Sequence, residues 1–298
     1  MKTAKSAARV SRGGQKPILR EPLKRILVVE DDDPTRHLLS TVLKGAKFSV
    51  VTAKDGIAGL RRLRKGGFDL ALLDIWMPGM NGLELLAQIR TEGLQTKAVV
   101  MTSDSTPETL LRAIREQAYY YLSKPVEPKT LLELVENALA ASPVPPIEVL
   151  SAQPEWVELL APCELGAAER IQSFISRLDV DLSEEVRESV GQVFREMLTN
   201  AIEWGGRLDP NRKVRIAYLR ARRMLLYRVA DPGSGFRIED LTHAAVGYSS
   251  SQPIEHVRVR QEKGIRPGGF GILMARAMVD ELLYNEAHNE VVFVKYLD

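Results

Sequence analysis

The sequence predicts an α/β doubly wound domain with a five-stranded parallel sheet, followed by a second domain that is an α+β sandwich. Three observations predict this. Short apolar runs alternate with helical stripes over residues 24–140, a proline-rich segment follows, and the remainder combines one long amphipathic helix with strands and two glycine clusters. The 298 residues, 45% of them hydrophobic, are enough for two modest cores.

The first domain is expected to alternate strictly between strands and helices. Ile26–Val29 is a continuous apolar run, which is typical of a strand buried on both faces. Five alternating pairs imply a parallel sheet with right-handed crossovers. The strands are expected at Arg25–Val29, Phe48–Ala53, Leu70–Asp74, Ala98–Thr102 and Tyr119–Leu122, and the helices at Thr35–Leu43, Gly56–Lys65, Leu83–Arg90, from Thr106 onward, and at Lys129–Ala140.

Polar side chains follow four of these strands. Glu30 and Asp31 end the first strand, Asp74 the third, Thr102 the fourth and Lys124 the fifth. The carboxyl ends of parallel strands meet at one edge of a sheet, so we expect these side chains to converge. Carboxylates about 4 Å apart repel by about 4 kcal/mol per pair at a surface-like dielectric, so the cluster calls for a hard cation such as Mg²⁺. Taken alone, Asp74 is equally well explained as a turn former or helix cap.

Residues 24–140 resemble the receiver domain of bacterial two-component response regulators. The resemblance rests on Val-Val-Glu-Asp, Asp-Ile-Trp-Met-Pro-Gly-Met-Asn-Gly, Met-Thr-Ser and Tyr-Leu-Ser-Lys-Pro. An acid-rich but inert doubly wound domain is the alternative. The resemblance implies that Asp74 accepts a phosphoryl group from a cognate histidine kinase or phosphotransfer protein. It also implies that Mg²⁺ is surrounded by Glu30, Asp31, Asp74 and the main-chain oxygen of Trp76. Thr102 and Lys124 would then contact the phosphoryl oxygens, and Tyr121 would be the switch aromatic.

The rest of the chain is divided by composition. Residues 1–23 are expected to be a disordered basic tail, residues 141–154 a proline-rich linker and residues 155–298 the second domain. The single Cys163 cannot form an intrachain disulfide, which favours a reducing compartment and a cytoplasmic protein. A net charge of +2 gives no reason to expect a specific nucleic acid partner, and no apolar run approaches the length of a membrane span.

The second domain is organised around a helix that starts after Ser183, a plausible N-cap. Glu196 and Asn200 are four residues apart, so they share one flank of this helix, about 40° apart around its axis. The glycine clusters at 231–236 and 266–272 allow close approach to a ligand, and Leu241–Ile265 suits a mobile lid. Strands are expected at Lys213–Leu219, Met224–Ala230, Leu282–Asn285 and Val291–Leu297.

Residues 155–298 resemble the Bergerat-type ATP-binding fold and, within it, the anti-sigma-factor serine kinases. The resemblance rests on Glu-Met-Leu-Thr-Asn from Glu196, Asp-Pro-Gly-Ser-Gly-Phe from Asp231 and Pro-Gly-Gly-Phe-Gly from Pro267. Two positions depart from relatives: Trp204 stands where many carry His, and Pro267 where histidine kinases have a glycine. The resemblance implies that Asn200 holds Mg²⁺ on the triphosphate of ATP and that Asp231 contacts the adenine amino group. It implies that Glu196 is the general base. The glycines that would line the lid and phosphates are Gly233, Gly235, Gly268, Gly269 and Gly271.

The favoured function is a response regulator whose phosphorylation on Asp74 controls an ATP-dependent serine/threonine kinase domain, which phosphorylates an anti-sigma antagonist or binds sigma factor directly. One alternative is a catalytically silent ATP-binding module that sequesters sigma factor or another regulator, and a weaker one is a DNA-bound regulator. The basic residues at 212–228 lie on expected strands, which favours a solvated hairpin or a docking face for an acidic partner. No histidine sits on a dimerisation hairpin, which argues against an autokinase. The direction of control and a homodimeric state stay open.

Overall fold

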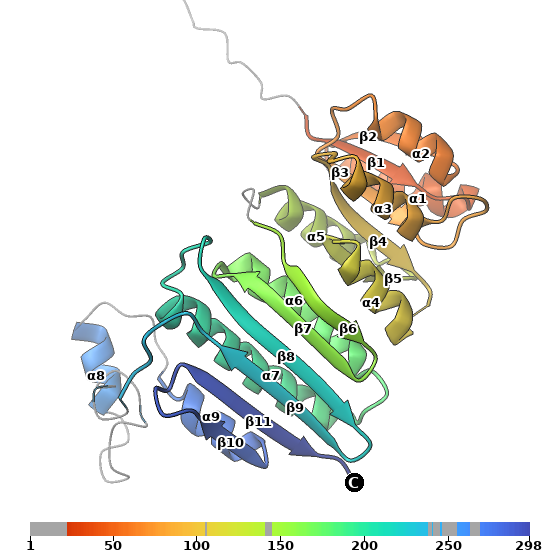
Figure 1. Cartoon of the computed structure of the whole chain (residues 1–298). Helices are drawn as coiled ribbons and strands as arrows, with labels where there is room; N and C mark the ends of the chain where they lie inside the picture. Colours follow the sequence, from red (N-terminus) through yellow and green to blue (C-terminus); the bar gives the residue numbers. More distant parts are fainter. Residues whose placement is uncertain are drawn as a thin grey trace, which may run out of the picture.

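The computed structural model describes residues 23–104, 106–140, 145–237, 240, 245, 255–262 and 269–298. The described chain forms two sheets with helices, and the chain passes from the first sheet to the second once (Figure 1). Residues 1–22 of the expected basic tail, residues 141–144 of the expected linker and most of the expected lid lie outside the described residues. Within the lid segment, the structure describes Ala245 and one helix, α8 (Glu255–Glu262).

The first unit is the predicted five-stranded parallel sheet, with strand order β2-β1-β3-β4-β5. Each helix begins at or near the expected residue because caps and prolines mark the starts, as Asp32 does for α1 and Asn81 for α3. The elements are β1 (Arg25–Val29), α1 (Asp33–Gly45), β2 (Ser49–Ala53), α2 (Gly56–Leu63), β3 (Leu70–Asp74), α3 (Gly82–Thr91), β4 (Lys97–Thr102), α4 (Pro107–Arg115), β5 (Tyr120–Ser123) and α5 (Pro128–Ala140).

Alternate residues of the strands enter two different cores, which confirms the doubly wound fold. On β1, Ile26 and Val28 pack with α1 and α5, whereas Leu27 and Val29 pack with α2, α3 and α4. All four side chains are fully buried, as their continuous apolar run predicts. The sheet is therefore held rigidly from both faces, and this fixes the positions of the residues at its carboxyl edge.

The second unit is an antiparallel sheet of strand order β10-β11-β9-β8-β7-β6, covered by helices on one face (Figure 1). The predicted strands and the long helix are present, but β6, β7 and α6 were not expected, and β6 lies inside the segment expected to be a linker. None of the described helices has the length and apolarity needed to cross a membrane. The elements are β6 (Glu148–Gln153), β7 (Trp156–Pro162), α6 (Leu165–Leu178), α7 (Glu184–Asn200), the π-helix η1 (Ala201–Gly205), β8 (Lys213–Ala221), β9 (Met224–Ala230), α8 (Glu255–Glu262), α9 (Gly271–Met278), β10 (Glu281–Tyr284) and β11 (Glu290–Tyr296).

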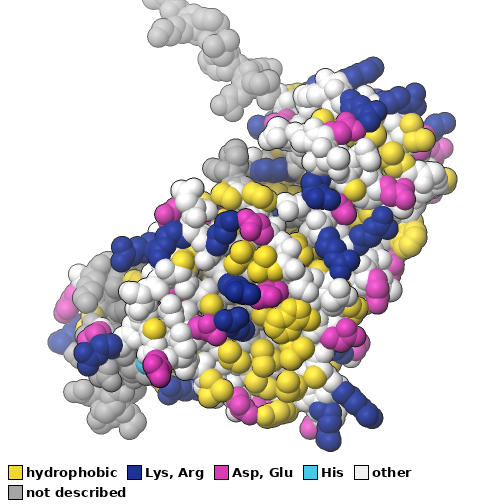
Figure 2. All heavy atoms as spheres, in the orientation of Figure 1, with side chains coloured by type: hydrophobic (Ala, Val, Ile, Leu, Met, Phe, Trp, Pro, Cys, Tyr) yellow, Lys and Arg dark blue, Asp and Glu magenta, His cyan; other side chains and the backbone are white. Residues whose placement is uncertain are grey.

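The open face of this sheet mixes apolar and charged side chains (Figure 2). Two of the basic side chains on its strands pair with acids on neighbouring strands: Arg215 lies 2.7 Å from Glu158, and Arg228 lies 2.7 Å from Glu290. Such ion pairs contribute little to stability where they are exposed to solvent. They show that part of the basic charge at 212–228 is balanced by acids of the same sheet.

The two units touch through α4, β5, α6 and β6. β6 is the edge strand of the second sheet, and carbonyl groups in it and just before it accept hydrogen bonds from side chains at and just after the end of α4. Arg115 donates to the carbonyl of Ala152, and Gln117 donates to the carbonyl of Ile147 at 3.3 Å. α4 of the first unit thereby covers a sheet edge that would otherwise present unpaired backbone groups.

A buried acid ties the end of α6 to the second sheet. Asp179 is 1% exposed and accepts hydrogen bonds from the hydroxyls of Tyr218 at 2.6 Å and Tyr227 at 2.8 Å. Burial raises the pKa of Asp179, although both phenols favour its ionised form and oppose that shift. The two tyrosines come from adjacent strands, so one carboxylate fixes a helix end against β8 and β9.

We expect Asp179→Ala to destabilise the protein by about 3 kcal/mol, because two buried hydroxyls would lose their acceptor. The matched control is Asp181→Ala, since Asp181 is an exposed partner of Arg220 and its loss is expected to cost about 1 kcal/mol or less. Urea unfolding followed by circular dichroism measures both changes. Equal losses in the two variants would contradict the role assigned to Asp179.

Candidate functional site

Three carboxylates gather at the carboxyl edge of the parallel sheet. Glu30 and Asp31 follow β1, Asp74 ends β3, and one carboxylate oxygen of each lies within 4.8 Å of the others. Glu30 is 1% exposed and Asp74 is 3% exposed, whereas Asp31 is exposed. Burial is the main cause that raises the pKa of both Glu30 and Asp74 above the usual range for carboxyls. The cluster is therefore costly to ionise without a cation.

One ammonium group partly balances this charge. The Nζ atom of Lys124, which follows β5, lies 2.8 Å from Glu30 Oε2 and 2.9 Å from Asp74 Oδ1, and it donates a hydrogen bond to Glu30 Oε1 at 3.0 Å. Glu30 Oε2 is buried, and the Lys124 ammonium that contacts it does so outside hydrogen-bond geometry. A buried carboxylate oxygen beside two further acids is the donor set that a hard divalent cation takes, so the residues fit Mg²⁺.

Thr102 and Tyr121 meet at the backbone of one residue, Asp104. Thr102 is fully buried, and its Oγ1 accepts a hydrogen bond from the Asp104 amide at 3.0 Å. The Tyr121 hydroxyl donates to the Asp104 carbonyl, and burial raises the pKa of Tyr121 to about 12. The predicted threonine and switch aromatic are thus linked through a single peptide segment, at the edge of the sheet that carries the acids.

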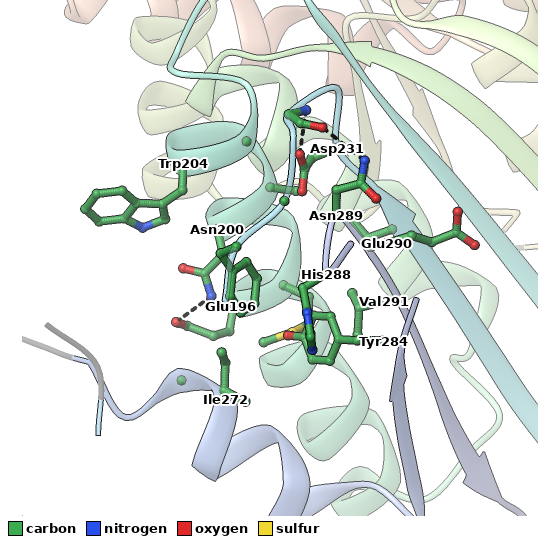
Figure 3. Close-up of a pocket in the computed structure, with 18 of the residues that line it drawn as sticks. Glu196, Asn200, Trp204, Asp231, Ile272, Tyr284, His288, Asn289, Glu290 and Val291 are labelled. Atoms are coloured by element: carbon green, nitrogen blue, oxygen red, sulfur yellow. Dashed lines mark hydrogen bonds between the residues drawn. The ribbon is translucent and has the colours of Figure 1, made fainter. Parts of the chain in front are cut away.

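The second site is a cavity of about 810 Å³ in the second unit (Figure 3). It lies between α7, the loop after β9, the start of α9 and the β10–β11 hairpin. Phe236, Tyr284 and His288 form one wall, with ring centroids 5.2 to 5.8 Å apart. A cavity of this size with an aromatic wall and a few polar groups is typical of a site for a small organic ligand.

The acid and amide predicted on one helix flank do face this cavity (Figure 3). Asn200 Nδ2 donates to Glu196 Oε1 at 3.1 Å, which orients both groups. The first residue of α9 packs directly against this pair: a Cβ atom built on Gly271 would lie 1.9 Å from Glu196 Oε1. Only glycine allows the open amino end of α9 to come this close to Glu196, and such helix ends bind anions.

Asp231 lies at the other end of the cavity and is held by its own loop. Its Oδ1 accepts a hydrogen bond from the Gly233 amide at 2.7 Å, and Asn289 Nδ2 donates to the Gly233 carbonyl at 3.0 Å. Burial raises the pKa of Asp231, opposed by the Gly233 amide and by Arg212. A Cβ atom built on Gly205 would lie 2.2 Å from the Asp231 carboxyl, so the π-helix η1 has to pass this carboxylate as bare backbone.

The structure places most of the predicted residues of this site on the cavity and adds others. Gly233, Gly235, Gly269 and Gly271 line it, whereas Gly268 lies outside the described residues. Gly205, Asn289 and the aromatic wall were missed. The pair Gly205-Gly206 after a long helix was a visible signal for close packing. Tyr284, His288 and Asn289 gave none, because a hairpin brings them to the cavity from far along the chain.

Two family models match the chain. The response regulator receiver domain matches residues 26–136, and the histidine kinase-like ATPase domain matches residues 161–295. The chain is a receiver domain followed by a histidine kinase-like ATPase domain. Membership of the receiver family implies phosphorylation by a histidine kinase and a role in two-component signalling, with Mg²⁺ at the acidic site, and members of the ATPase family bind ATP.

Similar proteins match the receiver domain or extend beyond it. The DNA-binding response regulator MtrA of Mycobacterium tuberculosis H37Rv is 29% identical over 77% of this chain and 98% of its own length. The regulatory protein VanRB of Enterococcus faecalis is 36% identical over 40% of this chain and 53% of its own length. Among solved structures, the chemotaxis protein CheY4 of Vibrio cholerae matches 40% of this chain and all of its own at 30% identity with a TM-score of 0.38. The response regulator TrrA of Thermotoga maritima, solved with Mg²⁺-BeF, is 34% identical. The match covers 39% of this chain and all of TrrA, with a TM-score of 0.37.

We expect Mg²⁺ to stabilise the receiver domain more strongly as the pH rises. Because folding raises the pKa of Glu30 and Asp74, the stability of the metal-free domain falls as the pH rises from about 4 through the raised values. Mg²⁺ binds the ionised carboxylates, so its effect grows over the same window to about 2–3 kcal/mol at a hundredfold excess over Kd. Thermal unfolding with and without MgCl₂ at about pH 5 and pH 7.5 measures it.

The control compares the two ends of β3. Asp74→Asn should remove most of the Mg²⁺ effect, whereas Asp69→Asn, at the residue just before the same strand, should keep it. Asp69 hydrogen-bonds Lys24 and the Arg25 amide, so its loss lowers stability equally with and without the metal. A Mg²⁺ effect that is independent of pH, or that survives in Asp74→Asn, would contradict the assigned metal site.

Proposed function

We propose that Asp74 is the phosphoacceptor of the receiver domain and that the ATPase domain is an ATP-dependent serine/threonine kinase of the anti-sigma type. An Asp74 oxygen attacks phosphorus of the donor phosphohistidine, the phosphorus–nitrogen bond breaks, and the imidazole keeps the electron pair. Lys124, 2.9 Å from Asp74, is placed to neutralise charge on the transferring oxygens, and Mg²⁺ at the acid cluster would supply the rest. Thr102, on the neighbouring strand, is placed to donate to a phosphoryl oxygen.

The observation that carries the kinase proposal is the Glu196–Asn200 pair inside the large cavity. The 3.1 Å hydrogen bond from Asn200 holds Glu196 beside the open amino end of α9. Phosphates bound at that helix end would lie next to a carboxylate that can take the proton of an attacking serine hydroxyl. Asn200 would hold the Mg²⁺ that accompanies the triphosphate, through its amide oxygen, since its Nδ2 is used on Glu196.

Asp231 is proposed to select the base at the far end of the cavity. Its Oδ1 is used by the Gly233 amide, and the second carboxylate oxygen is suited to accept a hydrogen bond from the adenine amino group. The aromatic wall of Phe236, Tyr284 and His288 supplies apolar surface for the nucleotide. The partners are then a cognate histidine kinase or phosphotransfer protein upstream and an anti-sigma antagonist or sigma factor downstream.

The catalytic role of Glu196 is tested with radiolabelled ATP and anti-sigma antagonist proteins that carry an acceptor serine. We expect Glu196→Gln to lower the transfer rate at least about 100-fold while ATP still binds, because a positioned base contributes at least that factor. Glu188→Gln, an exposed position on the same helix, should leave transfer unchanged. Transfer that survives in Glu196→Gln would contradict the assigned base.

The same assay decides between the two functions. The alternative is a silent nucleotide-binding module that sequesters sigma factor or another regulator. In that case ATP binds, no antagonist is labelled by the wild type, and partner binding is the same in wild type and Glu196→Gln. Pull-down of sigma factor with and without ATP measures this outcome.

We expect Gly205→Ala to weaken nucleotide binding by about 10-fold or more, because the added methyl group would displace the Asp231 carboxylate. The hydrogen bond that this carboxylate makes to the nucleotide would then be lost, and a hydrogen bond to a charged group contributes about 1.5–3 kcal/mol. Gly191→Ala is the matched control, because nothing lies within 4 Å of a Cβ atom at that position of α7. Calorimetric titration with ADP measures both affinities. Equal affinities in the two variants would contradict the assignment of Asp231 to the nucleotide.

A further inference from the structure

Two arginines of α6 insert into the receiver domain. Arg170 and Arg177 are seven residues apart, which places them on one face of the helix. Arg170 donates from Nε to the Tyr119 carbonyl at 3.1 Å, and its guanidinium lies 4.3 Å from the centre of the Tyr119 ring. Burial lowers the pKa of both arginines. Arg170 is buried and Arg177 is half-buried, so both cations lose contact with solvent where the two units meet, which is costly unless they find partners there.

Arg177 contacts the two receiver groups that are linked most directly to the acid site. Its guanidinium lies 5.1 Å from the centre of the Tyr121 ring and donates to Ser123 Oγ at 2.6 Å. Tyr121 is joined through Asp104 to Thr102, and Ser123 immediately precedes Lys124, which holds Glu30 and Asp74. The planar guanidinium makes both contacts at once, which a lysine ammonium does not.

The opposite side of α6 is coupled to the helix that carries the nucleotide-binding pair. Arg195 Nε donates to Gln172 Oε1 at 2.9 Å, and Arg195 is the residue before Glu196. At its end, α6 is fixed through Asp179 to Tyr227, whose ring packs 5.2 Å from that of Phe194 on α7. A shift of α6 is therefore transmitted to α7 through one contact at the middle of α6 and one at its carboxyl end.

We propose that Arg177 is the positioning residue that carries the phosphorylation state of Asp74 to the nucleotide pocket. When the Thr102 hydroxyl leaves the Asp104 amide for a phosphoryl oxygen, this amide loses its acceptor, and the peptide segment whose carbonyl holds the Tyr121 hydroxyl shifts. The ring beneath Arg177 then changes position, and α6 moves with the guanidinium. This inference rests on the proposed function, since it requires both a phosphoryl group on Asp74 and a nucleotide in the cavity.

The test measures coupling between the two sites in the full-length protein. Calorimetric titration gives the ADP affinity with and without Mg²⁺-beryllofluoride, and the beryllofluoride affinity with and without ADP. We expect each ligand to change the affinity of the other by one shared factor of about fivefold or more, because linkage is reciprocal. In Arg177→Ala both changes should fall below about twofold, while each ligand alone still binds.

Two further variants complete the design. Ser123→Ala removes the receiver-side acceptor with little loss of packing and should also reduce the coupling, so it decides the matter if Arg177→Ala fails to fold. Arg112→Ala removes an exposed arginine of α4 and should leave the coupling intact. Circular dichroism melting of each variant confirms the fold.

The outcomes separate this inference from the proposed function. If both ligands bind and the coupling is absent in the wild type, or persists unchanged in Arg177→Ala and Ser123→Ala, the inference is overturned and the proposed function stands. If the wild type binds no nucleotide, the proposed function fails. In that case hydrogen exchange of α6 decides the Arg177 step: a response to beryllofluoride that is lost in Arg177→Ala supports it, and an unchanged response overturns it.

Discussion

The structure depends on the charge balance at the carboxyl edge of the parallel sheet. Glu30 and Asp74 are buried next to each other, and the ammonium of Lys124 lies within 3 Å of both. Two buried carboxylates against one ammonium leave an excess negative charge, which the fold tolerates because burial raises the pKa of both acids. The edge is consequently sensitive to any change of charge, whether from a metal ion or from a phosphoryl group.

A change of charge at this edge is transmitted because the neighbouring polar groups contact one another directly. The Asp104 backbone is held by Thr102 on one side and Tyr121 on the other, and the Tyr121 ring lies under Arg177. Each contact is a hydrogen bond or a cation–π contact between groups that are at least partly buried. A hydrogen bond weakens steeply when its geometry changes. A displacement at the acid site is therefore passed to α6 instead of being lost in solvent.

Much of the fold and most of both sites followed from the sequence, because they rest on local patterns. Apolar runs such as Ile26–Val29 mark buried strands, and the residues after them mark the sheet edge. β6 was missed because it is a short, half-exposed edge strand, from Glu148 to Gln153, whose apolar and polar residues do not alternate clearly. Arg170 and Arg177 could not be recognised from the sequence, since two arginines on a helix normally lie in solvent. Their burial depends on a receiver surface that only the tertiary structure brings to α6.

The size of the coupling that this contact can carry is limited by its own composition. A change from about 1% to 99% population of an output state requires about 5.5 kcal/mol of differential interaction. Cation–π contacts contribute about 0.5–2 kcal/mol each, and a hydrogen bond from a charged donor about 1.5–3 kcal/mol. The Tyr121 and Ser123 contacts of Arg177 together fall short of a complete switch. Graded control of the nucleotide site is the behaviour that these contacts support, and a complete switch would require a partner that binds one arrangement of the two domains preferentially.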